Sequence, residues 1–401
     1  MTDTNNYRVA IVGAGPVGCV AALALAEAGV KVLLIEANEV LPEDLRASTF
    51  HPPTLDMLSE LGLTEFLIEN GLIAKTYQYR DRETGIYAEF DLSVLEGIVK
   101  HPFRVQCEQF KLTRKVVELL GEHPNAEVHL GAAFTRYEDN GDSVTVHFTK
   151  DGQDQVATCE YLLGTDGSRS LVREQMGMEF EGFTYPEQFL VVATDVPMDE
   201  KLPNLAPVNY VSAADDWCVV LRVVGNWRIL FPTDAGADRE ALLDPDTIEA
   251  RLQRLAPHAT RYPVLHKSLY RIHQRVAKTY RQGRVLIAGD AAHLNNPLGG
   301  MGMNGGVHDV VNLVSKLVPV LEGKADADVL DVYDRQRRTV TWNHVQAQTI
   351  ANKKIIEELN EEERIGRIHN LQKTAADRDS AIAYLRRHNM LDALEEAAQI
   401  A

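Results

Sequence analysis

The chain of 401 residues is 45% hydrophobic and 25% charged, with a formal net charge of −17. These values are typical of a soluble protein of two or three domains, and they argue against a surface for nucleic acid or anionic membrane, which needs basic patches. Four scattered cysteines, no signal-like leader and no uncharged apolar run of membrane-spanning length favour a reducing compartment, so we expect a cytoplasmic protein.

The first predicted unit is a strand, a glycine turn, a helix and a second strand, over residues 9–12, 13–18, 19–28 and 31–35. In its GxGxxG turn the first glycine makes the bend, the second admits a pyrophosphate, and the third lets helix and strand pack closely. Glu36 ends the second strand, where a carboxylate accepts ribose hydroxyls and repels a 2′-phosphate. We therefore expect the ADP part of FAD or NAD here. The candidate residues are Gly13, Gly15, Pro16, Val17, Gly18, Glu36 and Ala37.

The next segments alternate between helical and strand patterns. A helix is expected from Pro52 to a stop at Gly62, and an amphipathic helix over 108–120. Residues 184–233 alternate apolar and polar positions, which predicts a meander of antiparallel strands, and a short helix should follow over 246–255. Further strands are expected at 73–93, 126–130, 132–137, 144–149 and 155–163, with a hairpin turn at 140–142.

The segment 161–173 combines a strand, an Asp-Gly turn and a helix start. Taken alone, Asp166 could serve merely as an Asx-turn or N-cap acceptor. In company with the first unit, a role on the cofactor side of a cleft is the better interpretation.

The most informative segment is 285–306, an apolar strand that ends on Gly289 and Asp290 and is followed by a glycine-dense loop. A helix is expected next, over 307–321. A buried strand would carry the Asp290 carboxylate to its tip, the glycines would let backbone N–H groups approach a ligand, and the helix would present its positive dipole end. Two such sites far apart in the sequence suggest a large two-part cofactor that is held at both ends.

The ligand-facing and β-rich segments are interleaved, so both domains should be discontinuous. We expect a mixed α/β fold with a Rossmann-like cofactor domain, a β-sheet substrate domain and a helical C-terminal segment that is mostly solvated. The Rossmann-like domain would comprise residues 1–75, 100–180 and 270–335, the β-sheet domain 76–99 and 181–269, and the C-terminal segment 336–401.

The three motifs together match, in order and spacing, those of the FAD-dependent aromatic hydroxylases. The chain resembles these single-component, para-hydroxybenzoate hydroxylase-like monooxygenases over about residues 7 to 340. The resemblance implies non-covalent FAD in the Rossmann-like domain and NADPH or NADH as co-substrate. Two departures stand out: Met301 replaces a Gln that many members have in the glycine loop, and the residues from Trp342 onward match no assignable pattern.

The resemblance also implies roles for single residues. Asp290 would contact the ribityl chain, and Pro297 would lie over the flavin face where the substrate ring rests. Gln109 and Arg46 are expected beside FAD, and Asp166 would serve both FAD and NAD(P)H. The remaining cofactor-binding candidates are Gly289, Gly300, Gly302, Met303 and Asn304, and no metal is expected.

Candidates for substrate contact come from the strand run 209–232, which faces the flavin in the family. Alternation lets only half of its side chains point inward. Tyr210, Arg222 and Arg228 share parity, and any one of them could equally face outward. The catalytic candidates are Pro297, His293, Arg222 and Tyr210, although His293 could instead pack against the strand or bond to backbone.

The function that the resemblance implies is an NAD(P)H- and O2-dependent flavoprotein monooxygenase. It would hydroxylate a small aromatic or heteroaromatic substrate through a flavin hydroperoxide, as a monomer or homodimer. Two alternatives stay open: another FAD oxidoreductase on the same fold, such as an epoxidase, reductase or halogenase, or a non-catalytic flavin-binding ligand sensor. The halogenase signature Trp-x-Trp-x-Ile-Pro is absent, because residues 226–232 contain one Trp.

Overall fold

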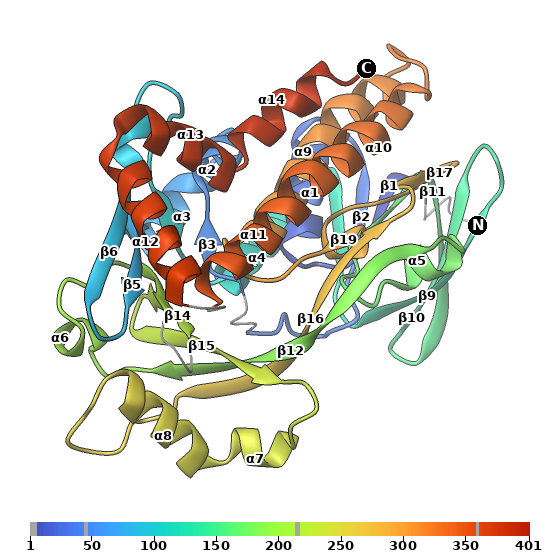
Figure 1. Ribbon diagram of the computed structural model, residues 1–401. Helices are drawn as coiled ribbons and strands as arrows, with labels where there is room; N and C mark the ends of the chain where they lie inside the picture. Colours follow the sequence, from blue (N-terminus) through green and yellow to red (C-terminus); the bar gives the residue numbers. More distant parts are fainter. Residues whose placement is uncertain (1–5, 44–46, 213–216, 358–360) are drawn as a thin grey trace.

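The computed structural model describes residues 6–43, 47–212, 217–357 and 361–401 (Figure 1). Its first sheet is built around β1 (Asn6–Val12), an apolar strand that pairs in parallel with β2 and β11. In spatial order the path is β17 (Arg281–Gln282), β18 (Val285–Ile287), β11 (Gln153–Gly164), β1, β2 (Val32–Ile35) and β8 (Ala126–His129), with β10 (Val144–Lys150) and β9 (Ala132–Asp139) continuing from β11.

The parallel strands of this sheet end at one edge. Gly13 donates its N–H to the Ile35 carbonyl at 2.7 Å, and Thr165 donates to the Val12 carbonyl at 2.9 Å. Ala288 donates to the carbonyl of Gly164 at 3.0 Å. The loops after four strands therefore meet at the carboxyl edge, where ligands of such sheets bind.

The second sheet has the order β19, β16, β12, β15, β14, β13, β5, β6. The expected antiparallel meander is confirmed for β13, β14 and β15. It is wrong for β12, because α6 (Met198–Lys201) and a crossover carry the chain from β12 past two strand positions to β13. The hairpin β5–β6 completes the sheet through parallel pairing of β5 with β13. The strands are β5 (Thr76–Asp81), β6 (Gly85–Asp91), β12 (Phe180–Thr194), β13 (Val208–Ser212), β14 (Cys218–Val223), β15 (Asn226–Asp234), β16 (His266–Ala277) and β19 (His293–Leu294).

A small third sheet, with strand order β3, β7, β4, lies near the first sheet. Its strands are β3 (Thr49–Phe50), β7 (Arg104–Gln106) and β4 (Leu72–Ala74). The mixed α/β class is confirmed. The division into discontinuous domains stays a prediction, and β16 runs across the boundary expected at residue 270.

Three helices pack together over the first sheet: α1 (Pro16–Glu27), α4 (Gln109–Glu122) and α9 (Met301–Leu321). The expected start of α9 at residue 307 is wrong, because Gly300 adopts a left-handed conformation with φ of 68° and the helix begins directly after it. Gly306 therefore lies inside the helix. A Cβ atom there would lie 2.5 Å from Val17 Cγ2 and 3.0 Å from Gly289 Cα, so glycine lets α9 pack against α1 and the tip of the first sheet.

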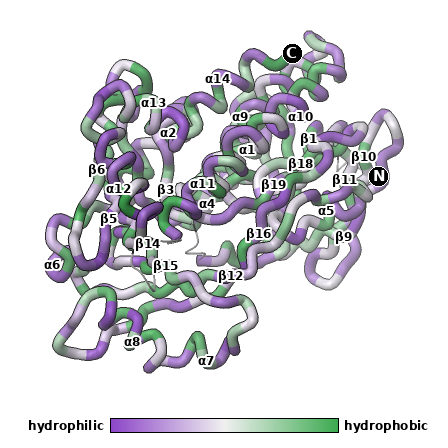
Figure 2. The backbone as a smooth tube through the Cα atoms, in the orientation of Figure 1, coloured by the Kyte–Doolittle hydropathy of each residue, from purple (hydrophilic) through white to green (hydrophobic). Residues whose placement is uncertain are grey.

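The C-terminal helices are more buried than expected. Tyr384 and Leu385 join a hydrophobic cluster with strands of the second sheet, because α12 packs on β6 and α13 on the short helix 92–95. Figure 2 shows hydrophobic and hydrophilic residues alternating along this segment. Its helices are α10 (Val329–Val340), a π-helical turn Thr341–Gln346, α11 (Ala347–Ile356), α12 (Glu361–Ala376), α13 (Arg378–His388) and α14 (Leu391–Gln399).

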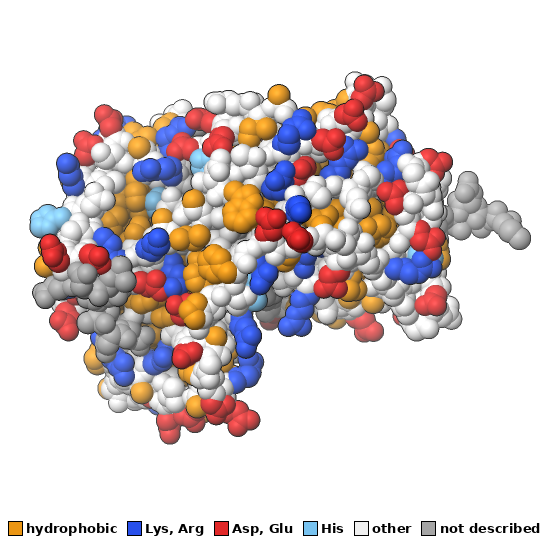
Figure 3. All heavy atoms as spheres, turned by 45° about the vertical axis from the view of Figure 1, so that its right-hand side comes forward, with side chains coloured by type: hydrophobic (Ala, Val, Ile, Leu, Met, Phe, Trp, Pro, Cys, Tyr) orange, Lys and Arg blue, Asp and Glu red, His pale blue; other side chains and the backbone are white. Residues whose placement is uncertain are grey.

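The remaining helices are short, and the last of them packs on a face of the second sheet through Ile248, Leu252 and Leu255. They are α2 (Pro52–Ser59), α3 (Thr64–Asn70), α5 (Leu171–Gln175), α7 (Arg239–Leu243) and α8 (Pro245–Leu255). Charged side chains of both signs are mixed over the face that Figure 3 shows. Among the described residues, no helix is long and apolar enough to cross a membrane.

Candidate functional site

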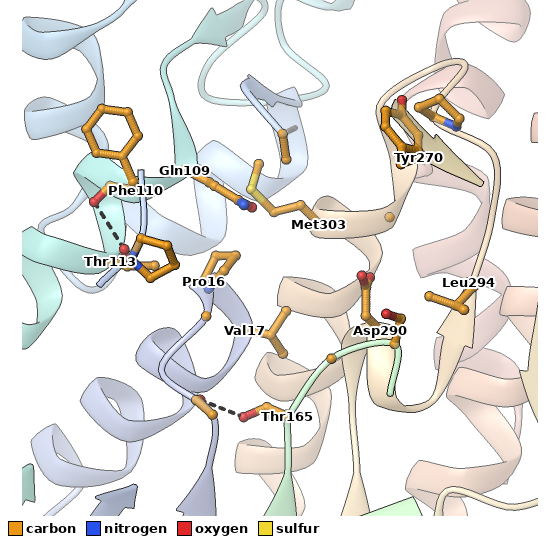
Figure 4. Close-up of a pocket in the computed structure, with 18 of the residues that line it drawn as sticks. Pro16, Val17, Gln109, Phe110, Thr113, Thr165, Tyr270, Asp290, Leu294 and Met303 are labelled. Carbon is orange, nitrogen blue, oxygen red and sulfur yellow. Dashed lines mark hydrogen bonds between the residues drawn. The ribbon is translucent and has the colours of Figure 1, made fainter. Parts of the chain in front are cut away.

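A cavity of about 680 Å³ runs from the carboxyl edge of the first sheet to one face of the second sheet. On the first side its wall includes Gly13, Glu36 and Asp290. On the second side it includes Tyr210 and Pro297. Figure 4 shows side chains from α1, α4, α9 and the Asp290 turn surrounding this space.

The glycine turn forms one end of the cavity, and its three glycines differ in their surroundings. A Cβ on Gly15 would meet nothing within 4 Å, so the backbone is open to a ligand there. A Cβ on Gly13 would lie 2.6 Å from the carbonyl oxygen of Thr165, and one on Gly18 would overlap the carbonyl of Gly13. Gly13 and Gly15 line the cavity, whereas Gly18 lies behind them and allows α1 to pack.

Two helix N-termini converge on the cavity. The N-cap residues of α1 and α9 are Gly15 and Gly300, which have no side chain to accept the first-turn N–H groups. The first residues of both helices line the space, and they are Pro16, Val17, Met301, Gly302 and Met303. Because each helix N-terminus carries partial positive charge, this wall suits an anionic group such as a diphosphate.

Glu36 is oriented at the edge of the cavity by its own neighbours. Its carboxylate accepts the N–H of Ala14 at 2.9 Å, and the N–H and side-chain amide of Asn38 at 2.9 and 2.6 Å. Ala37 and Asn38 line the cavity beside it. Carboxylate oxygens retain lone pairs after these bonds, so Glu36 can also accept hydroxyl groups of a ligand.

Asp290 and Gln109 lie further along the cavity. Asp290 stands on a single 3-10 turn, Gly289–Ala291, and Figure 4 shows its carboxylate directed into the space. Gln109 begins α4, and the same view shows its amide directed toward Met303. The expected position of Arg46 lies outside the described residues.

Asp166 lines the cavity but uses its carboxylate locally. It accepts the Ser170 hydroxyl at 2.5 Å and the N–H of Val172 at 3.1 Å, which fastens the start of α5. Burial raises the pKa of Asp166, and these hydrogen bonds oppose that effect. The structure therefore gives it the anchoring role that an isolated Asp-Gly turn suggests, at a place that a cofactor can still reach.

His293 lies behind the cavity wall in a buried charged network. Its Nε2 atom is 2.9 Å from Asp309, which also accepts Arg337 Nε at 2.7 Å and the N–H of Gly289 at 3.1 Å. Burial alone would raise the pKa of Asp309, but His293 and Arg337 lower it, so the carboxylate stays charged. The network joins the strand tip to α9 and α10. The structure thus places His293 and Gly289 behind the lining of the cavity, and their contact with a ligand stays a prediction.

Arg222 lies on the far face of the second sheet. Its guanidinium is 5.3 Å from the ring centre of Trp227 and pairs with Asp199 at 2.9 Å. Arg222 thus takes the outward orientation that alternation left open, because odd positions of β14 face the cavity while even positions do so in β13 and β15. Val208, Tyr210, Val219, Leu221 and Leu230 line the cavity.

Asn304 and Arg228 are also buried away from the cavity. The Asn304 amide donates to the carbonyls of Thr49 and Gly300 at 2.8 and 2.6 Å and accepts the N–H of His51 at 2.9 Å. These bonds join β3 to α9, and the expected contact of Asn304 with the cofactor stays a prediction. Arg228 pairs with Glu108 at 3.1 Å.

Arg104 lines the cavity and was missed by sequence reasoning. It lies in a three-residue strand with no motif around it, so neither spacing nor periodicity marked it. The one available signal was a charged residue between the apolar residues Phe103 and Val105.

The chain matches proteins of known activity over most of its length. The sequence profile of a family described as "FAD binding domain" covers residues 6–348. Para-nitrophenol 4-monooxygenase of Pseudomonas sp. (strain WBC-3) is 34% identical over 86% of this chain and 86% of the relative. A 6-hydroxy-3-succinoylpyridine 3-monooxygenase of Pseudomonas putida is 34% identical over 82% of this chain and 84% of the relative.

Solved structures match beyond the residues that the family profile covers. The crystal structure of p-nitrophenol 4-monooxygenase from Pseudomonas putida DLL-E4 is 28% identical, with a TM-score of 0.91. The match covers 98% of this chain and 99% of that one, so it extends through the C-terminal helices.

Proposed function

Because the chain belongs to the FAD-binding-domain family of flavin-dependent aromatic monooxygenases, we propose that it hydroxylates a small phenol with NAD(P)H as reductant. The expected enzyme class and the FAD cofactor are confirmed by these relationships. Bound FAD supplies the redox chemistry of such enzymes, which is acceptance of a hydride and activation of dioxygen. What we propose is the substrate, the choice of nicotinamide and the roles of single residues.

The residues of the cavity fit FAD from end to end. The open side of Gly15 and the N-terminus of α1 suit the diphosphate, and Glu36 suits the hydroxyls of the ADP ribose. Asp290 is placed to accept hydroxyls of the ribityl chain, while the N-terminus of α9 would stabilise negative charge on the reduced ring.

The cavity face formed by the second sheet supports a flat, single-ring substrate. The aliphatic part of that wall is Val208, Val219, Leu221, Leu230 and Ile272. Pro297 and Tyr270 add ring surfaces to it. An apolar wall of this kind excludes water from the reacting atoms, and aromatic substrates stack well on such surfaces.

Tyr210 supplies a phenol to this wall, and we assign to it the orientation of the ring hydroxyl. Burial raises the pKa of its phenol, while the charge of Arg104 acts in the opposite direction. Tyr210 therefore stays protonated near neutral pH and can donate a hydrogen bond to a phenol or phenolate oxygen.

The single observation that carries the proposal is the continuity of the cavity from the glycine turn to the apolar wall. One cofactor held at the first sheet can thereby reach a substrate at the second. The two relatives named above act on a nitrophenol and a hydroxylated pyridine, which supports a monocyclic hydroxylated ring as substrate here.

The test is turnover with a panel of simple phenols and hydroxypyridines under isotopically labelled dioxygen. We expect an accepted substrate to stimulate NAD(P)H oxidation, and its product to gain one labelled oxygen atom. Label from water, or a product changed only in hydrogen, would instead support the reductase alternative. Ligand binding with no product from any compound would support the sensor.

A further inference from the structure

Arg104 is a buried cation at the substrate side of the cavity. Its side chain lines the space, is only 2% exposed, and lies over the Tyr77 ring with its guanidinium carbon 4.6 Å from the ring centre. Nε donates to the side-chain oxygen of Asn389 at 3.0 Å. Among the residues that the structure describes, no carboxylate lies within ion-pair distance of it. A buried charge without a counter-ion is unfavourable unless a ligand supplies one.

The groups around Arg104 do not neutralise it. His51 and His388 are fully buried, and burial, together with the charge of Arg104, lowers the pKa of both, to about 3 for His388. Both imidazoles are therefore neutral at physiological pH, and so are the tyrosines Tyr77 and Tyr210, whose pKa values burial raises. None of these four neighbours therefore supplies a negative charge to Arg104.

The C-terminal segment holds this charge in place without cancelling it. Asn389 follows α13 directly, is fully buried, and donates its amide N–H to the Leu385 carbonyl at 2.7 Å, so its oxygen must face Arg104. The helix itself is fixed by Tyr384, whose hydroxyl is 2.9 Å from that of Tyr79 and whose ring stacks on Phe90 with centres 4.2 Å apart. An asparagine at this place orients the guanidinium, whereas an aspartate would neutralise it.

We propose that Arg104, positioned by Asn389, binds an anionic oxygen group of the aromatic substrate, a phenolate or a carboxylate. The proposal rests on the proposed function and specifies its substrate class. It also gives the segment after residue 340 a task, which is to complete the substrate end of the cavity. Arg104 would contact the substrate, and Asn389 is a positioning residue.

The test compares anionic ligands with neutral analogues of similar shape, by calorimetric titration of the FAD-loaded protein. One pair is 4-hydroxybenzoate and 4-hydroxybenzamide, and the other is 4-nitrophenol above its pKa and 4-nitroanisole. We expect the wild type to bind the anion of at least one pair about tenfold more tightly than its neutral twin, which corresponds to about 1.4 kcal/mol. The pair that shows the preference identifies the carboxylate or the phenolate as the recognised group.

In Arg104→Gln the preference should disappear while affinity for the neutral twin stays unchanged. Arg104→Lys should retain part of it, because the charge remains but the fork of donors is lost. Equal losses for both twins, or a preference that survives in Arg104→Gln, would overturn the assignment.

Two further variants separate this subsite from general effects on folding. Asn389→Asp places a carboxylate against the guanidinium, so it should abolish the anion preference with FAD content unchanged. Arg284→Gln is the matched control, because Arg284 also lies over a tyrosine ring, at 5.0 Å from Tyr161, and bonds to backbone carbonyls outside the cavity. It should leave the preference intact. A wild type that hydroxylates phenols yet shows no charge preference would refute the subsite alone.

Discussion

Glu36 has two tasks at once, because the oxygens that would receive a ribose also hold Ala14 and Asn38 in position. We expect Glu36→Ala to weaken FAD binding by about 1–3 kcal/mol, the range for removing a partner from buried polar groups. Fluorescence titration of the apoprotein with FAD measures the change. FMN, which lacks the ADP part, should bind poorly to wild type and variant alike. Glu39→Ala, an exposed neighbour outside the cavity, is the control, and an unchanged FAD affinity in Glu36→Ala would refute the assignment.

Asp290 is the carboxylate at the middle of the cavity, and its loss should disturb alignment more than folding. We expect Asp290→Ala to unfold at nearly the wild-type temperature, to hold FAD less tightly, and to release more peroxide per NAD(P)H oxidised. A shift of about one ångström in a reacting ring can lower the rate about a hundredfold. Parallel measurement of product and peroxide checks the coupling. Full occupancy with fully coupled turnover would show that Asp290 does not position the cofactor.

Asp309 supports the site from behind, and its effect should appear as a dependence of stability on pH. Its folded pKa is lowered by His293 and Arg337, so the stability it contributes is present above the unfolded carboxyl pKa of about 4 and is lost as the pH falls below that value. Asp309→Asn should lower the free energy of unfolding by about 3–5 kcal/mol at neutral pH, because the buried guanidinium of Arg337 loses its counter-ion. Urea titrations between about pH 3 and 7 should also show a shallower loss on the acid side than in wild type. A parallel pH dependence in both proteins would contradict the assigned network.

At the scale of elements, the junction of α1, α9 and the first sheet depends on a glycine, which has no side chain. Gly306→Ala would drive a methyl group into Val17 and the Gly289 backbone, so we expect a loss of about 1–3 kcal/mol in stability and weaker FAD binding. Gly366→Ala in α12 is the matched control, since a Cβ there meets nothing within 4 Å, and it should be neutral or slightly stabilising. Thermal unfolding with and without added FAD separates the two effects. Wild-type behaviour in Gly306→Ala would mean that α9 can move away without consequence.

Local sequence patterns predict the elements whose signals lie within a few neighbouring residues. They fail for features that depend on packing between segments distant in the sequence. The strand, turn, helix and strand from β1 to β2 were found because glycines and apolar runs mark them directly. The glycine run predicts a start of α9 that is too late, because such a run is typical of a loop. In the structure Gly306 lies inside the helix, where the close approach of Val17 requires a glycine. The orientation of Arg222 could not be predicted, because the connections from β13 to β14 and from β14 to β15 both change which positions face inward. Arg104 has no local signal strong enough to assign it, since its role arises from residues distant in sequence.

At the scale of the whole molecule, the cavity lies between the two sheets, and the C-terminal helices reach its lining through the contact of Asn389 with Arg104. The composition, the motifs and their order were sufficient for the fold class, the cofactor and the enzyme class. These features could not predict that the last helices pack against the second sheet. The charged faces of the helices resemble those of solvated helices, and few residues, such as Tyr384 and Leu385, are buried in the contact. Substrate recognition is thus shared by segments that no single motif spans.

The contact between Arg104 and Asn389 also bears on how the protein is made. Synthesis proceeds from the N-terminus, so the glycine turn leaves the ribosome long before α9, and α9 before α13. The cofactor can be held at both ends only once α9 has emerged, and the Arg104 guanidinium gains its acceptor only when Asn389 has followed. A translation product stopped between these two helices would therefore have both parts of the flavin site but an unfinished substrate end.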